Sequence, residues 1–153
     1  MRFLGNIEAR VDVKGRVFLP AAFRKVLQSE GEDLLVLRKD VHENCLVLYP
    51  QSVWVEQMDF MRSKLNRWNR EQQNIFRQFV SDVENIALDG NGRILLSRRF
   101  MEVAGIDQMV RFIGVGDTIE IWAAGSNSEQ FMNPDDFSKA LEELMGGPTP
   151  TLP

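Results

Sequence analysis

Two short segments of the chain place an aspartate and an arginine four residues apart, with a glycine directly before the arginine. A glycine supplies positive φ at little cost, and an aspartate can accept backbone N–H bonds inside a bend, so the pattern predicts a tight hairpin turn. An arginine held across such a turn could contact phosphate oxygens or the edge of a guanine base. The residues are Asp12, Gly15 and Arg16 in the first segment, and Asp89, Gly92 and Arg93 in the second.

For a single such pair, a purely structural role is the simpler interpretation, in which the aspartate caps the turn and the arginine pairs with it. The duplication of the pair and the basic residues nearby favour a binding role. Lys14 lies inside the first turn, and Arg98 and Arg99 follow the second turn closely, so each turn can lead a local basic patch. The predicted DNA-binding residues are Lys14, Arg16, Arg93, Arg98 and Arg99, and the predicted turn-forming residues are Asp12, Gly15, Asp89 and Gly92.

Both turns belong to two copies of one longer unit. Residues 12–23 align with residues 89–100 at an offset of 77 (89 minus 12), and Asp, Gly, Arg, Leu and Phe recur at matching positions. Such self-similarity indicates an internal repeat. With small length changes the match extends to residues 34–38 against 109–113, and to residues 45–49 against 118–122.

Each copy predicts the same elements: a strand, the turn, a short apolar strand, a helix, and two strands joined by a further turn. Pro20 suits the first turn of the first helix, which we expect to end near residues 29–31. The last two strands of the first copy are expected at residues 34–37 and 46–49, and those of the second copy are joined through residues 114–117. The predicted fold class is α+β.

Residues 53–80, between the copies, predict an amphipathic helical linker whose apolar stripe is first of all a packing face. Asn69, with Gln72 three residues later, predicts a helix start with a reciprocal cap, which favours two packed helices over one. A last helix is expected to begin at Asn133 and Pro134, before a disordered tail. The predicted stripe consists of Met58, Met61, Leu65, Trp68, Gln72, Ile75 and Phe79.

Composition places the chain among folded globular proteins, with 44% hydrophobic and 26% charged residues. The formal net charge of −4 argues mildly against nucleic acid. Its distribution matters more: residues 1–27 hold six basic and two acidic side chains, whereas residues 124–153 hold one basic and five acidic ones. No apolar run approaches the roughly 18 residues of a membrane span. We therefore expect no membrane contact and a cytoplasmic protein, which the DNA-binding role predicted for the basic turns would place on the nucleoid.

The chain offers little for catalysis or metal binding. Cys45 and His42 are the only residues of their types, so neither a disulfide nor a zinc site is expected, and Cys45 is better interpreted as a small buried hydrophobe than as a nucleophile. Residues 89–92 superficially match a calcium loop, but its sixth and twelfth positions hold Ile94 and Phe100. We predict no catalytic residues, no metal and no cofactor.

Several segments, in order, resemble the MraZ family; they are residues 3–6, 12–20, 48–50, 89–95 and 115–122. The resemblance covers residues 1 to about 124. It implies two tandem AbrB-type DNA-binding units whose halves interleave into a swapped-hairpin barrel, and assembly into closed rings. It also implies repression or tuning of the division and cell-wall gene cluster that includes the protein's own gene. The DNA-contacting residues that it implies are Asp12, Lys14, Arg16, Asp89 and Arg93.

The expected organisation is a first DNA-binding unit, a helical linker, a second DNA-binding unit, and a C-terminal helix with a disordered tail. We expect the DNA to be double-stranded promoter sequence with direct repeats about one helical turn apart. An alternative function is an oligomeric scaffold or antitoxin-like partner-binding protein, in which the basic turns are incidental and the linker is the interface. The four expected segments are residues 5–52, 53–80, 81–124 and 125–153.

Overall fold

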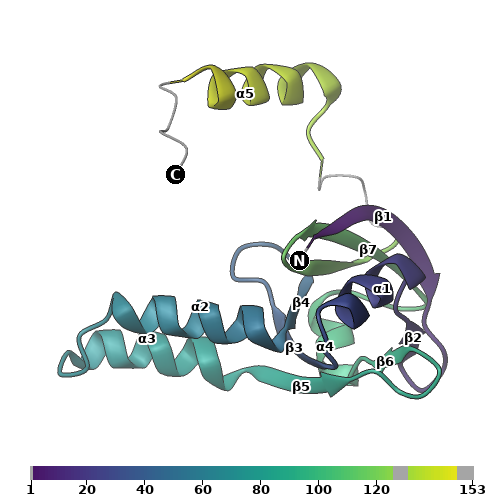
Figure 1. Ribbon diagram of the computed structural model, residues 1–153, viewed down its shortest axis with the longest axis horizontal. Helices are drawn as coiled ribbons and strands as arrows, with labels where there is room; N and C mark the ends of the chain where they lie inside the picture. The colour runs from purple at the N-terminus through teal and green to yellow at the C-terminus, as the bar shows by residue number, and fades with distance from the viewer. Residues whose placement is uncertain (1, 126–130, 148–153) are drawn as a thin grey trace.

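The computed structural model describes residues 2–125 and 131–147, which form an α+β fold (Figure 1). The predicted disordered tail begins at Gly146, but this residue ends the last helix of the structure; residues 148–153 of that tail lie outside the described part of the chain. In chain order the elements are β1 (Phe3–Arg10), β2 (Arg16–Phe18), α1 (Ala21–Ser29), β3 (Leu34–Lys39), β4 (Leu46–Pro50), α2 (Gln51–Ser63), α3 (Arg70–Ser81), β5 (Val83–Ala87), β6 (Arg93–Leu95), α4 (Arg98–Val103), β7 (Met109–Gly116), β8 (Ile119–Ala123) and α5 (Pro134–Gly146).

The two repeats interleave their strands. Six strands form one antiparallel sheet in the order β1-β7-β8-β4-β3-β5, and β2 pairs with β6 in a separate two-stranded ribbon. Strand β1 of the first repeat therefore pairs with β7 of the second, and β5 of the second repeat pairs with β3 of the first. A unit of about 45 residues buries too little surface to be stable alone, and this exchange gives both units a common core.

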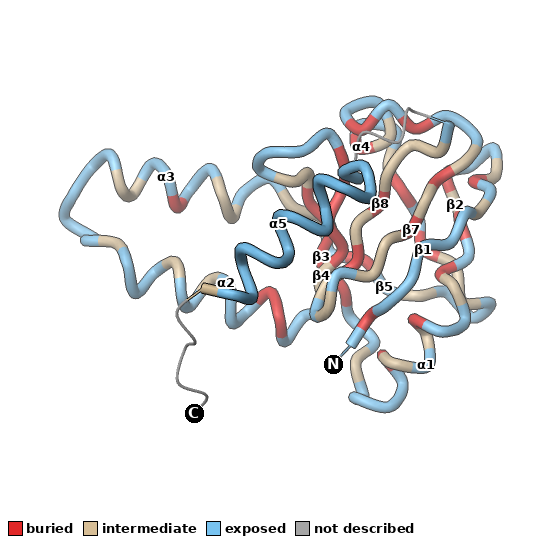
Figure 2. The backbone as a smooth tube through the Cα atoms, turned by 90° about the horizontal axis from the view of Figure 1, so that it is seen from above, coloured by how far each residue is buried: buried red, intermediate tan, exposed pale blue. Residues whose placement is uncertain are grey.

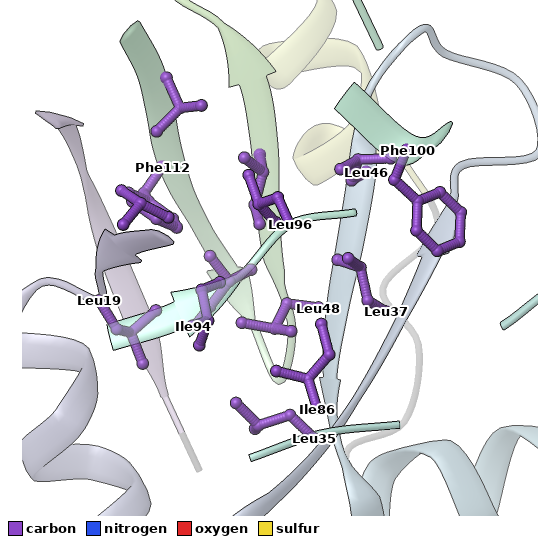
Figure 3. Packing of buried hydrophobic residues seen from close by; sticks show 14 of the residues in the cluster. Leu19, Leu35, Leu37, Leu46, Leu48, Ile86, Ile94, Leu96, Phe100 and Phe112 are labelled. Atoms are coloured by element: carbon purple, nitrogen blue, oxygen red, sulfur yellow. The ribbon is translucent and has the colours of Figure 1, made fainter. Parts of the chain in front are cut away.

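That core lies between the six-stranded sheet and the β2–β6 ribbon (Figure 3). Leu19 and Ile94 come from the two strands of the ribbon or their ends, and they point toward Leu48 and Phe112 of the sheet. Equivalent positions of the repeat fill equivalent places, since Phe23 of α1 and Phe100 of α4 are both fully buried. Truncating either phenylalanine to alanine would cost about 3–5 kcal/mol.

The linker forms two helices, as the sequence predicted. Asn69 caps α3, because its Oδ1 accepts the backbone N–H of Gln72 at 3.0 Å. The reciprocal half of the predicted cap is wrong: the side-chain oxygen of Gln72 accepts the backbone N–H of Asn66, at 2.5 Å, and not that of Asn69. The turn between the helices folds back toward α3, which brings Asn66 within reach of this side chain.

The apolar stripe predicted along the linker is confirmed in part: Met58, Met61, Leu65, Gln72 and Phe79 are half-buried, but the other two members are not. Trp68 is 96% exposed and Ile75 is half exposed, whereas the buried residues of the two helices are Val53, Trp54 and Phe76. A stripe of constant period requires one continuous helix. The turn at residues 64–69 interrupts the helix. The spacing of three and four residues that holds along α2 therefore does not mark the buried face of α3.

Two further boundaries differ from the prediction. The turn expected at residues 114–117 is shorter, because β7 continues through Gly114 to Gly116, and the N–H of Val115 bonds the carbonyl of Thr118 at 3.0 Å. Pairing with β1 extends β7, and Gly114 admits this close neighbour: a Cβ there would lie 2.5 Å from the carbonyl carbon of Phe3. Pro20 precedes α1 as its N-cap residue and does not lie in the first helical turn.

Helix α5 begins where the sequence predicted, and Asn133 caps it by accepting the N–H of Asp136 at 2.9 Å. None of its described residues is buried. The helix lies apart from the sheet in Figure 1 and is exposed along its whole length in Figure 2. Within residues 2–125 and 131–147, no helix has the length and apolar character that crossing a membrane requires.

Candidate nucleic-acid interface

The first turn is closed by a network centred on Asp12. Its Oδ1 accepts the backbone N–H groups of Lys14 and Arg16, both at 2.9 Å, and its Oδ2 accepts Nε of Arg16 at 2.8 Å. The backbone adds bonds from the N–H of Asp12 to the carbonyl of Arg16 and from the N–H of Gly15 to the carbonyl of Asp12. The aspartate therefore fixes both the shape of the turn and the direction in which the arginine leaves it.

The second turn repeats this network. Asp89 accepts the backbone N–H groups of Asn91 and Arg93 at 2.9 Å, and Nε of Arg93 at 2.8 Å. In each turn the ion pair uses Nε. As far as the described residues show, the two terminal nitrogen atoms of each guanidinium are left to bind a further acceptor. Each arginine therefore closes its turn and still carries nitrogen atoms that can bind a further acceptor.

Hydrogen bonding keeps the two carboxylates ionised. The backbone N–H of Arg16 is the largest influence that holds the pKa of Asp12 below its ordinary value, and the backbone N–H of Arg93 does the same for Asp89. Donors that bind the charged form of a carboxyl group lower its pKa. The turns therefore keep their ion pairs at neutral pH.

Each turn is anchored by the other repeat. The carbonyl of Gly15 accepts the N–H of Leu96 at 2.8 Å, and the carbonyl of Gly92 accepts the N–H of Leu19 at 3.0 Å. Between these bonds, β2 and β6 pair so that Phe18 faces Arg93. The two turns are therefore held at a fixed separation by a ribbon to which each repeat contributes one strand.

The interleaving also exchanges the helices beside the turns. Arg98, which follows the second turn in sequence, lines a hollow of about 710 Å³ beside the first turn, together with Arg10 and Lys14. Arg24 of the first repeat lies against Gly92 of the second turn, and its Nη1 donates to the carbonyl of Leu19. The sequence prediction did not include Arg10 or Arg24, because residues near a turn in the chain are not those near it in the fold.

Arg99 is engaged by carboxylates from β5 and the residue before it. Its Nη1 lies 2.6 Å from Oδ1 of Asp82, its Nη2 lies 3.7 Å from Oε1 of Glu84, and about half of its side chain is exposed. The predicted basic residues therefore occupy different settings. Lys14, Arg16 and Arg98 gather at the first turn, Arg93 lies at the second, and Arg99 is paired with acids.

The residues considered for other chemistry do not form a site. Cys45 is fully buried directly before β4, where burial raises the pKa of its thiol to about 12, with Glu120 and nearby acids adding to the shift. The thiol is therefore neutral at physiological pH and unreactive. Among the described residues, no group of three or more histidine, cysteine, aspartate or glutamate side chains could hold a metal ion.

Comparisons with known proteins agree with the internal repeat, because one family model matches the chain twice. The family model described as "MraZ protein, putative antitoxin-like" matches residues 2–77 and 79–145. The chain is 61% identical over 146 residues to the transcriptional regulator MraZ of Phocaeicola vulgatus, which covers 95% of both chains. It is 59% identical to the protein of that name from Bacteroides fragilis, over 95% of this chain and 92% of the relative. The Coxiella burnetii protein is 33% identical, over 93% and 98%.

Proposed function

The chain belongs to the MraZ family, and from this premise we propose that it is a transcriptional regulator that binds double-stranded DNA in a sequence-specific manner. MraZ is a family of regulators and not of enzymes, in agreement with the sequence prediction that the chain has no catalytic residues. The observation that carries the proposal is the pair of matching Asp–Arg turns joined by the β2–β6 ribbon.

Physical chemistry supports the assignment of these turns to DNA. A guanidinium that is already oriented by a carboxylate loses little conformational freedom when it binds a phosphate or a guanine edge. The first turn adds cations that would meet the phosphate backbone. We propose that Lys14, Arg16, Arg93, Arg98 and Arg99 contact DNA, with Asp12, Gly15, Asp89 and Gly92 shaping the turns.

We further infer the regulatory setting from the family. The proposed targets are the promoter of the protein's own gene and the division and cell-wall cluster to which it belongs, with repression as the proposed action. The proposed assembly is a closed ring of AbrB-type swapped-hairpin barrels, located in the cytoplasm on the nucleoid. The proposed division of the chain is residues 5–52 and 81–124 as the two DNA-binding units, 53–80 as the linker, and 125–153 as the C-terminal segment.

The test is binding of the full chain to a fragment of its own promoter, measured by fluorescence anisotropy. Arg16→Ala and Arg93→Ala should each weaken specific binding, because one bidentate base contact is worth about 1–3 kcal/mol, or roughly 5- to 150-fold. Arg77→Ala is the matched control, since it removes an arginine whose side chain bonds Asn74 of the same exposed helix face. Unchanged affinity for both turn variants, with unchanged circular dichroism, would contradict the proposal.

Operator geometry can be tested with the same assay. A closed ring presents the same turn repeatedly in one polarity, so we expect direct repeats about 10 bp apart. Moving one repeat by half a helical turn, or inverting it in place, should weaken binding. If neither change altered the affinity, the protein would not bind direct repeats that are spaced by whole helical turns.

A partner-binding scaffold is the second candidate function. It is favoured by the antitoxin-like description of the family model and by the exposed aromatic residue Trp68 at the end of the α2–α3 hairpin. The two functions differ in their response to salt. DNA binding weakens steeply as the salt concentration rises, because the release of counterions from the DNA then contributes less free energy. A scaffold would show no promoter affinity at low salt, whereas a regulator would lose that affinity on raising salt and keep its assembly.

A further inference from the structure

We propose that the tips of the two turns select different bases: Val13 of the first turn contacts the C5 methyl group of a thymine, and Asn91 of the second turn binds an adenine. The inference rests on the proposed binding of DNA and names two bases beside those that the arginines contact. A chain with this asymmetry recognises a site whose two halves differ, so it binds that site in one direction only.

The β2–β6 ribbon places the two turns on either side of a local twofold axis. Its antiparallel pairing is centred on Val17 and Ile94, which occupy equivalent positions of the repeat, at the offset of 77 (94 minus 17). The bonds from the backbone N–H groups to the aspartate are also the same in both turns, all at 2.9 Å. The backbone therefore presents two matched halves to DNA, so a difference in base preference between them has to come from side chains.

The outer face of the ribbon mixes cations with exposed apolar side chains. Side chains alternate between the two faces of a strand, and the middle residue of each strand is buried, so the residues on either side of it face outward. Arg16 lies opposite Leu95, and Phe18 lies opposite Arg93; the two apolar side chains are each 55% exposed. Phosphate oxygens offer apolar side chains no partner, whereas the methyl group of thymine does. This face is therefore suited to base edges as well as to the phosphate backbone.

The tips of the turns differ in sequence although their backbones match. Val13 and Lys14 form the first tip, and the equivalent residues of the second tip are Gly90 and Asn91. The backbone N–H of Lys14 and that of Asn91 make the same bond to the aspartate of their turn. Gly90 does not have a positive φ, so the turn does not require a glycine there. Because the same turn forms with either pair of residues, its shape does not dictate these side chains, and the difference is available for recognition.

Val13 is the apolar member of the first tip. Its side chain is fully exposed, so it contributes nothing to the core of the chain. It is followed by Lys14, whose ammonium group can meet a phosphate or a guanine. The C5 methyl group of thymine is the apolar group that a base pair presents in the major groove. Burying one such methyl group is worth about fourfold in affinity, which the second tip cannot gain through Gly90.

Asn91 is the polar member of the second tip. Its side chain is exposed, and among the described residues the amide has no hydrogen-bond partner. An amide combines an acceptor with two donors, which matches the N6 donor and the N7 acceptor of adenine. Lys14 has donors only, so the first tip cannot bind adenine through both groups. A side chain at Gly90 would lie in open space, so nothing in the described chain blocks the approach of a base to the amide.

Base analogues that each remove one group from the DNA test the two contacts separately. The full chain is titrated with the promoter fragment of its own gene, and binding is followed by fluorescence anisotropy. Replacing each thymine in turn by deoxyuridine removes only the methyl group, and at least one replacement should weaken binding by about fourfold. Replacing each adenine in turn by 7-deazaadenine removes the N7 acceptor, and at least one replacement should weaken binding roughly 2- to 12-fold.

Variants then assign each sensitivity to a residue. Val13→Gly, which gives the first tip the glycine of the second, should bind the thymine and deoxyuridine fragments equally but keep the sensitivity to N7. Asn91→Ala should bind the adenine and 7-deazaadenine fragments equally but keep the sensitivity to the methyl group. Val41→Gly and Asn44→Ala are the matched controls, because they change exposed residues of the loop between β3 and β4, and both should keep both sensitivities.

The outcomes distinguish this inference from the proposed function. A parent chain with no affinity for the promoter fragment would overturn both. A parent that binds the fragment but is indifferent to every deoxyuridine, or to every 7-deazaadenine, would overturn this inference alone. A methyl sensitivity that persists in Val13→Gly, or an N7 sensitivity that persists in Asn91→Ala, would also overturn it, because the contact would then belong to another residue.

Discussion

Arg24, in the helix of the first repeat, lies against Gly92, in the turn of the second repeat, so closely that a Cβ on the glycine would lie 2.8 Å from Cδ of the arginine. The equivalent glycine of the first turn, Gly15, faces the backbone carbonyl oxygen of Leu96 instead. Matching positions of the repeat therefore have different tolerance for a side chain, because the end of an arginine side chain can move more easily than a backbone carbonyl.

We predict that Gly15→Ala destabilises the protein more than Gly92→Ala. Both glycines have φ near +85°, at +89° and +84°, so alanine costs about 1–2 kcal/mol at either. At Gly15 the added methyl group also meets backbone, and relief requires the β2–β6 ribbon to shift. Urea unfolding of the two variants measures the difference. Gly90→Ala, at a position with open space and no positive φ, is the control, and equal losses at both turns would contradict the prediction.

Arg98→Ala and Arg99→Ala should separate binding from stability. Arg98 lines the hollow beside the first turn, so its loss should weaken promoter binding and leave unfolding unchanged. Arg99 pairs with Asp82 and Glu84 at the surface, so its loss should cost about 0.2–1 kcal/mol of stability and weaken binding less. Anisotropy and urea unfolding on the same preparations provide both values. A larger binding loss for Arg99→Ala would reverse the roles assigned here.

Acid should loosen both turns. The pKa values of Asp12 and Asp89 are lowered in the folded protein, so the stability that these carboxylates contribute is fully present above the unfolded value of about 3.9. This contribution to stability is lost as the pH falls through the lowered pKa values that the two carboxylates have in the folded protein. NMR titration of the two side-chain carboxyl groups should give midpoints below that of an unstructured peptide. Midpoints at the peptide value would show that the turn network does not hold the charge.

An amide tests the same network at neutral pH. Asp12→Asn keeps an oxygen that can accept the N–H groups of Lys14 and Arg16, but it loses the ion pair with the Arg16 side chain. We expect it to fold and to bind DNA less well than the parent, because the guanidinium is no longer oriented. Asp12→Ala should in addition lose stability, so equal stability of the two variants would contradict the role of the backbone bonds.

The sequence was most informative where the signal is local. Gly15 and Gly92 marked the turns, Asn69 and Asn133 marked helix starts, and the burial of Cys45 followed from the apolar run after it. Each of these features depends on the chemistry of a few consecutive residues. The alignment of the two copies also predicted a relationship between distant segments, namely that both copies form the same elements.

What the sequence missed depends on contacts between distant segments. The length of β7 is set by β1, which lies about a hundred residues earlier, so Gly114 looked like a turn. The cations beside each turn, Arg24 and Arg98, come from the other repeat, and no spacing along the chain reveals them. The burial of Arg38, which stacks on Phe79 from a distant helix, was not predicted from the sequence.

Separating the repeats should abolish folding. In residues 1–52, β1 loses its partner β7 and β2 loses β6, and in residues 81–124, β5 loses β3 and β8 loses β4. Each fragment keeps only one hairpin, β3–β4 or β7–β8, and exposes strand edges together with a buried phenylalanine, Phe23 or Phe100. Open edges and apolar faces of this kind promote aggregation rather than a stable monomer.

We therefore expect neither fragment alone to show a cooperative thermal transition by circular dichroism, whereas an equimolar mixture should recover one. Recovery follows because every pairing that separation removes lies between the fragments and not within either. The mixture should melt at a temperature that rises with concentration, since association is now bimolecular. The parent chain, in which residues 53–80 join the two parts, is the control for a melt within one chain. A cooperative, monomeric melt of either fragment by itself would show that a single repeat holds its own core, and the interleaving would then be a consequence of tethering rather than the source of stability.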